Sequence, residues 1–87
     1  MTSEVHEVVG EEKIGEVCRK YKLTQEDRNA IDKILEEWEY LVGEIDQKNR
    51  VAFNIIGSNP RRARIIHALR DINIIFMLEK MKKRSMN

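Results

Sequence analysis

The chain has 87 residues, which is enough for one domain with one small hydrophobic core. Apolar residues make up 41% of it and charged residues 36%, a balance typical of a folded, highly charged helical protein and not of a disordered chain. Cys18 is the only cysteine, which excludes an intrachain disulfide and a thiolate-rich zinc site, and no apolar run approaches the roughly 18 residues of a membrane span.

The net charge of +1 conceals two oppositely charged halves. Residues 1–48 contain 13 acidic and 7 basic side chains, whereas residues 49–87 contain 2 acidic and 9 basic ones. The second half is therefore a candidate for contact with an acidic protein or with nucleic acid. Glu4 and Glu7 stand where a signal peptide would carry bases, so we expect a cytoplasmic protein.

The first ten residues show no sustained helical period and end on Gly10, so we expect a flexible N-terminal arm over residues 1–10. A single helical domain over residues 11–87 is predicted to follow. Within it, the apolar residues between positions 14 and 21 repeat at intervals of three and four, which predicts a short helix over about 11–22.

A second helix is predicted to begin after Thr24, a good N-cap residue that two acidic residues follow within the first turn. Apolar residues then recur at intervals of three and four as far as Ile56, which predicts one long helix over about 25–56. Gly43 and the polar pair Lys48–Asn49 are the two places where this helix could kink or split.

The Gly-Ser-Asn-Pro segment at 57–60 predicts a tight turn, because Gly57 suits the left-handed position after a helix end and Pro60 suits the first turn of the next helix. A helix over about 60–83 follows. A turn this short predicts that the two long helices form an antiparallel hairpin. The register of that hairpin predicts ion pairs of Lys80 with Glu36 and Glu37, of Asp32 with Lys83 and Arg84, and of Asp46 with Arg70.

The segment 72–78 is apolar around most of the helix circumference, more than a single facing helix can cover. We therefore expect an all-α fold, a short N-terminal helix plus two long helices in an antiparallel hairpin, that dimerises into a helical bundle. A strand over 72–78 is the alternative, but the long helical periods around it argue against a strand. Met77 and Met81 are interpreted as core or interface filler. The expected oligomer interface consists of Ile72, Ile74, Ile75, Phe76 and Leu78.

Basic side chains gather at the predicted hairpin tip, and three of them fall near a helix start, where the helix dipole disfavours cations. Several guanidinium groups beside free backbone N–H groups would bind a phosphate or a carboxylate. The alternative is that the tip docks onto the acidic segment 26–39 of a second copy. The candidate residues for anion or nucleic-acid binding are Arg50, Arg61, Arg62, Arg64 and His67.

The sequence indicates no catalytic, metal-binding or cofactor-binding residues. Neither His6 nor His67 has a carboxylate or cysteine at metal-ligand spacing, and Cys18 has no histidine near it on its helix. A DNA-reading helix-turn-helix over 14–31 is disfavoured because its second helix is acidic and would repel phosphates.

We therefore expect a non-enzymatic, homo-oligomeric helical adaptor or regulator that acts through protein–protein contacts. Its expected partners are a second copy of the chain and an acidic protein or nucleic acid. The alternative function is nucleic-acid binding through the arginine cluster at the tip. No membrane and no small-molecule substrate is inferred.

Overall fold

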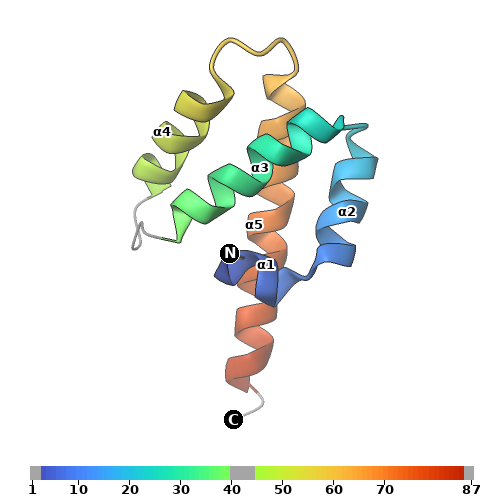
Figure 1. The fold of residues 1–87 in the computed structure, drawn as a ribbon. Coiled ribbons are helices and arrows are strands. Elements are labelled where there is room, and N and C mark those ends of the chain that lie inside the picture. Colours follow the sequence, from blue (N-terminus) through green and yellow to red (C-terminus); the bar gives the residue numbers. More distant parts are fainter. Residues whose placement is uncertain (1–2, 40–44, 86–87) are drawn as a thin grey trace.

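The computed structural model describes the backbone of residues 3–39 and 45–85 and the side chains of residues 3–39 and 47–82. These residues form helices and no strand, so the all-α class is confirmed and the strand alternative for 72–78 is wrong. The helices are α1 (Glu4–Val9), α2 (Glu11–Lys20), α3 (Gln25–Trp38), α4 (Ile45–Ile56) and α5 (Arg62–Ser85). Helix α5 forms the central axis, against which α1, α2 and α3 pack (Figure 1).

Helix α1 lies where the sequence indicated a flexible arm. Ser3 caps it: the Ser3 hydroxyl accepts from the backbone N–H of His6 (3.2 Å), and His6 Nδ1 accepts from the backbone N–H of Ser3 (3.3 Å). Val5 and Val9 are buried in the core. The sequence did not reveal α1 because a helix of six residues has too few turns to display an apolar period.

Helix α3 begins at Gln25, as predicted. The hydroxyl of Thr24 accepts from the backbone N–H of Asp27 (3.2 Å), and the Asp27 carboxylate accepts from the backbone N–H of Thr24 (3.1 Å). The turn before this cap contains Lys22 in the left-handed backbone conformation (φ 54), which glycine adopts more readily.

The second predicted helix is in fact two helices, because α3 ends at Trp38 and α4 packs back against it. The Trp38 indole N–H donates to the backbone carbonyl of Lys48 (2.9 Å), and the side chain is buried between the two helices. Gly43, one of the two places where the sequence allowed a break, lies outside the described residues. The other place, Lys48–Asn49, lies inside α4, so it does not break the helix.

Gly57 ends α4 with a φ of 61°, as predicted, but Lys80 of α5 does not make the ion pairs expected for the hairpin. Lys80 pairs with Glu4 of α1 (3.0 Å) and not with Glu36 or Glu37 of α3. The reason is that α1 covers this part of α5 and α3 contacts α5 nearer its start.

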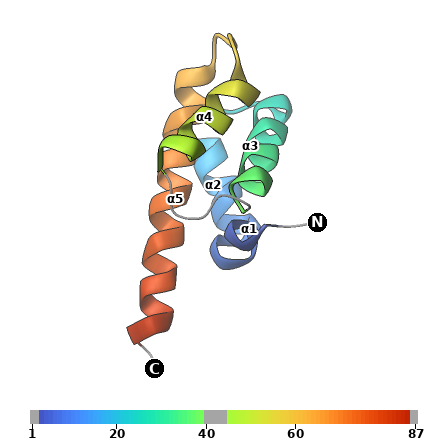
Figure 2. The same cartoon turned by 90° about the vertical axis from the view of Figure 1, so that its left-hand side faces the viewer.

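All of these helices contribute to one hydrophobic core. Its buried apolar residues are Val5, Val9, Ile14, Val17, Cys18, Ile31, Ile34, Leu35, Trp38, Ala52, Ile56, Ile65, Ala68, Leu69 and Ile72. The last turns of α5 extend beyond the other helices (Figure 2). Within residues 3–39 and 45–85, this leaves part of a long helix without a cover from another helix.

Candidate interaction surface on helix α5

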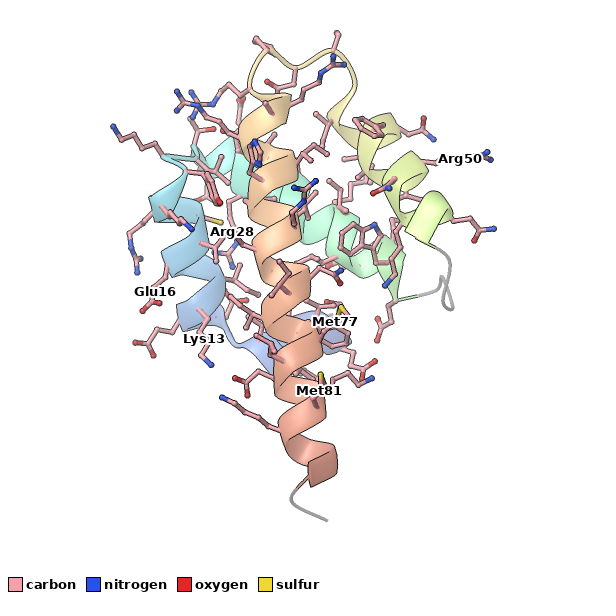
Figure 3. All side chains as sticks on the ribbon, turned by 180° about the vertical axis from the view of Figure 1, so that it is seen from behind. Lys13, Glu16, Arg28, Arg50, Met77 and Met81 are labelled. Carbon is pink, nitrogen blue, oxygen red and sulfur yellow. The ribbon has the colours of Figure 1, made fainter. Side chains whose placement is uncertain are left out.

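Helix α5 carries a second apolar stripe on the side turned away from the core. Ile74, Met77, Leu78 and Met81 follow one another at i, i+3, i+4 and i+7, and their exposed fractions are 49, 56, 53 and 63%. In Figure 3 the Met77 and Met81 side chains lie one turn apart on the side of α5 that no other helix covers. We call these four residues the outer stripe.

The structure sorts the predicted interface residues between two sides of α5. Ile74 and Leu78 belong to the outer stripe. Ile72 is fully buried in the chain's own core, so its assignment to an interface between copies is wrong. Ile75 and Phe76 are partly buried and pack against the same core. The sequence could not distinguish the core side of this segment from its outer side, because apolar residues occupy most of the helix circumference there.

Beside the outer stripe, α2 and α5 flank an open groove of about 550 Å³. Its lining residues are Lys13, Glu16, Val17, Ile75, Leu78, Glu79, Met81 and Lys82. Lys13 Nζ lies 2.9 Å from Glu79 Oε1 and ties α2 to α5 across the groove. Hydrogen bonding to Lys13 and its positive charge lower the pKa of Glu79. Glu16 makes no ion pair with any residue that the structure describes.

The structure divides the predicted arginine cluster, because Arg61 turns inward. Its Nε donates to Asp27 Oδ2 (2.8 Å), and its Nη2 donates to the backbone carbonyl of Lys22. Asp27 is only 2% exposed. Burial raises the pKa of the Asp27 carboxyl, but hydrogen bonds from Arg61 and Thr24 outweigh burial and leave the pKa below its ordinary value.

The other members of the predicted cluster lie apart. Arg50 is exposed on α4 and points away from α5 (Figure 3). Arg62 and Arg64 are exposed at the start of α5 and form no ion pair within the described part of the chain. The ring of His67 stacks on Tyr21 at the end of α2, with ring centres 6.0 Å apart. Two exposed arginines therefore remain together where five candidate residues were expected.

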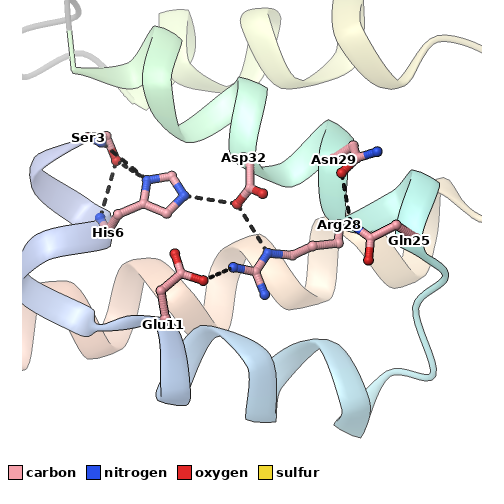
Figure 4. A network of polar contacts seen from close by, with 7 residues as sticks. All are labelled: Ser3, His6, Glu11, Gln25, Arg28, Asn29 and Asp32. Carbon is pink, nitrogen blue, oxygen red and sulfur yellow. Dashed lines mark hydrogen bonds and ion pairs between the residues drawn. The ribbon is translucent and has the colours of Figure 1, made fainter. Parts of the chain in front are cut away.

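A polar cluster that sequence analysis did not identify joins α1 to α3 (Figure 4). Ser3 Oγ lies 2.6 Å from His6 Nδ1, and His6 Nε2 lies 2.9 Å from Asp32 Oδ1. Arg28 donates to the same Asp32 oxygen (3.1 Å) and to Glu11. The order serine, histidine, aspartate is that of a hydrolase triad. However, Ser3 is fully buried and caps α1, so this cluster holds α1 in place.

Asp32 was predicted to face Lys83 and Arg84, and its partners are His6 and Arg28 instead. The side chains of Lys83 and Arg84 lie outside the described residues. The same holds for Asp46, which was predicted to lie near Arg70. Since residue spacing gives only contacts within one helix or across an assumed hairpin, the polar contact of His6 on α1 with Asp32 on α3 had no signal in the sequence.

Among the side chains that the structure describes, no group of three His, Cys, Asp or Glu residues is placed to hold a metal ion. None of the described helices is both long and apolar enough to cross a membrane. No protein-family model matches the chain, and comparison with curated proteins and with solved structures gives no significant match. The described residues define an all-α protein.

Proposed function

We propose that this protein is a non-enzymatic helical adaptor that self-associates through the outer stripe and works through protein–protein contacts. The observation that carries the proposal is the set of four roughly half-exposed apolar side chains at heptad spacing on α5. Single exposed apolar residues are common on protein surfaces, but a contiguous apolar stripe marks an interaction site.

A second copy of the same stripe fits this surface. Side chains at i, i+3, i+4 and i+7 form a ridge, and the ridges of two such helices pack into each other's grooves at a shallow crossing angle. Helix α5 has 24 residues and is therefore about 36 Å long. Its last turns lie clear of the other helices, which leaves room for a second helix along them (Figure 2).

The charge and the available area also favour a second copy as the partner. The net charge of +1 imposes little repulsion between two copies. A stable dimer buries about 800 Å² per partner, more than four half-exposed side chains provide. The adjoining groove between α2 and α5, with Val17 and Ile75 in its lining, supplies further apolar surface next to the stripe.

Sedimentation velocity over a range of concentrations tests the proposal. We expect the wild-type protein to be a dimer at micromolar concentration and the Leu78→Glu variant to be a monomer with unchanged helix content. Phe53→Glu is a matched control, because Phe53 on α4 is 50% exposed, similar to the 53% of Leu78. A monomeric wild type, or a Leu78→Glu variant that remains dimeric, contradicts the proposal.

A second candidate function is binding of nucleic acid or an acidic protein through Arg62 and Arg64. The observation that favours it is their exposure without ion pairs inside the described part of the chain. Binding to generic duplex DNA, single-stranded DNA and RNA is measured across a salt series. Salt-sensitive binding that is lost in the Arg62→Ala/Arg64→Ala variant supports this function. Binding that this variant retains contradicts it.

A further inference from the structure

Helix α2 runs beside α5 in the opposite direction, and two ion pairs fix the level of each α2 residue along α5. Lys13 Nζ lies 2.9 Å from Glu79 Oε1, and Lys20 Nζ lies 3.2 Å from Asp71 Oδ2. Glu16 is about one turn along α2 from Lys13, so it lies level with residues 75 and 76 of α5. Consistent with this level, Glu16 and Ile75 both line the groove.

Glu16 is an exposed carboxylate at the edge of this groove and forms no ion pair among the described residues. Lys13 and Lys20, its neighbours on the same face of α2, are both paired with α5. A partner that covers the groove and brings a cation near Glu16 is favoured, because a charged group that loses water without a partner is costly. Figure 3 shows Lys13 and Glu16 on α2 beside α5.

We infer that the two copies of α5 pair antiparallel, with Glu16 of each copy against Lys13 of the other. This inference rests on the proposed self-association. The midpoint of the outer stripe lies between Met77 and Leu78, and a twofold axis there sets Ile74 opposite Met81 of the second copy. Residues 75 and 76 of one copy are then level with residues 79 and 80 of the other.

An antiparallel pair related by a twofold axis brings the same flank of both helices to the same side. The α2 flank of one copy therefore faces the α2 flank of the other. Glu16 of one copy lies beside residues 75 and 76 of its own α5, and these residues lie opposite residues 79 and 80 of the second copy. Lys13 of the second copy lies beside its own Glu79, so it is at the same height as Glu16 of the first copy. Two reciprocal Glu16–Lys13 pairs result. The Lys13 ammonium has three donors, so it can serve Glu79 and Glu16 together.

A parallel pair would set the α2 flank against the opposite flank of α5. The charged residues nearest to the level of Glu16 on that side are Arg70, which is exposed, and Lys80, which pairs with Glu4 of its own chain (3.0 Å). Each is about five residues from the level of residues 75 and 76, roughly 7 Å along α5. The antiparallel order is favoured because it sets Glu16 level with Lys13.

Disulfide cross-linking tests whether the two copies of α5 are antiparallel. In a Cys18→Ala background, we expect a mixture of Ile74→Cys and Met81→Cys chains to form a disulfide between the two variants under mild oxidation. The Ile74→Cys chain alone should not cross-link, since the two copies of position 74 lie far apart in an antiparallel pair. Cross-linking of Ile74→Cys with itself and not with Met81→Cys would overturn the antiparallel order.

Charge exchange tests the Glu16–Lys13 contact. Glu16→Lys alone and Lys13→Glu alone each set like charges against each other in the homodimer, so we expect each dissociation constant to rise about tenfold at low salt. A mixture of the two variants restores attraction at both contacts and should form heterodimers preferentially. If the wild type and Leu78→Glu behave as proposed but the mixture shows no such preference, the contact is wrong and self-association stands. A monomeric wild type overturns both.

Discussion

Arg61 Nε donates to Asp27 Oδ2 across 2.8 Å and so joins the start of α5 to the start of α3, two positions 34 residues apart in the sequence. The same carboxylate accepts from the backbone N–H of Thr24, so one buried group caps α3 and anchors α5. An arginine that the sequence placed in an anion-binding cluster is therefore a structural residue.

Replacing Arg61 should cost stability, whereas replacing Arg62 next to it should not. Arg61→Ala leaves the buried Asp27 carboxylate without its cation, so we expect the free energy of unfolding to fall by about 2 kcal/mol. Arg62→Ala removes an exposed side chain and should stay within about 0.5 kcal/mol of the wild type. Urea denaturation at one fixed protein concentration measures both. Equal losses in the two variants would show that Arg61 does not hold the helices together.

Acid should weaken the protein through Asp27. The pKa of Asp27 is lowered in the folded state, so its stabilising effect is present above its ordinary pKa of about 3.9 and is lost as the pH falls through the folded pKa. Asp27→Asn cannot titrate. We therefore expect the stability difference between wild type and this variant to shrink as the pH falls below about 4. A difference that stays constant with pH would contradict the assignment.

Helix α1 should be ordered and should depend on His6. We expect hydrogen exchange to find protected amides towards the end of α1, and His6→Ala to remove most of this protection. The variant loses the bonds to Asp32 and Ser3, an expected loss of about 1–2 kcal/mol in the docking of α1. Glu7→Ala is the control, since Glu7 is exposed on the same helix. If the amides of α1 exchange as fast as those of an unfolded peptide, these residues form the flexible arm that the sequence indicated.

Truncation of a side chain should have different effects on the two sides of α5. Ile72→Ala opens a cavity in the core and should lower the free energy of unfolding by about 3 kcal/mol. Ile74→Ala should lower the intrinsic stability of the monomer by less than about 1 kcal/mol but weaken self-association. Denaturation in the Leu78→Glu background measures the stability of the monomer without self-association. Sedimentation velocity measures the strength of self-association. A large loss of monomer stability in Ile74→Ala would mean that the outer stripe belongs to the core.

The thiol of Cys18 should be unreactive in the folded protein. The side chain is 8% exposed, and burial raises its pKa although Arg28 acts in the opposite direction. We expect an aromatic disulfide reagent to modify Cys18 much faster in denaturant than in native buffer at the same pH. Equal rates in the two conditions would show that the α2 face carrying Cys18 is open to solvent.

The features that could be predicted from the sequence are those that depend on neighbouring residues. Thr24, with two acidic residues in the turn after it, predicted the start of α3, and Gly57 predicted the end of α4. Both depend on backbone groups within a few residues of each other, so short-range spacing is enough to identify them. The apolar side of α2 likewise follows from residues one turn apart.

The features that the sequence did not carry are contacts between distant segments. The apolar repeat continues from α3 into α4 and so looks like one helix, although the chain folds back and buries Trp38 between them. The inward turn of Arg61 depends on Asp27, and the order of α1 depends on Asp32, neither of which is a neighbour in the sequence. The outer stripe is distinguished from the core side of α5 by burial in the folded structure, where Ile72 is fully buried.

The position of α1 against α5 has a consequence for synthesis on the ribosome. Val5 and Val9 of α1 are translated before α5, the helix against which α1 packs most. Until α5 leaves the ribosome, the apolar side of α1 lacks its main cover, although α2 can already pack against part of it. Helix α1 therefore completes its packing only after α5 has been made, and the nascent chain carries a partly covered apolar segment until then.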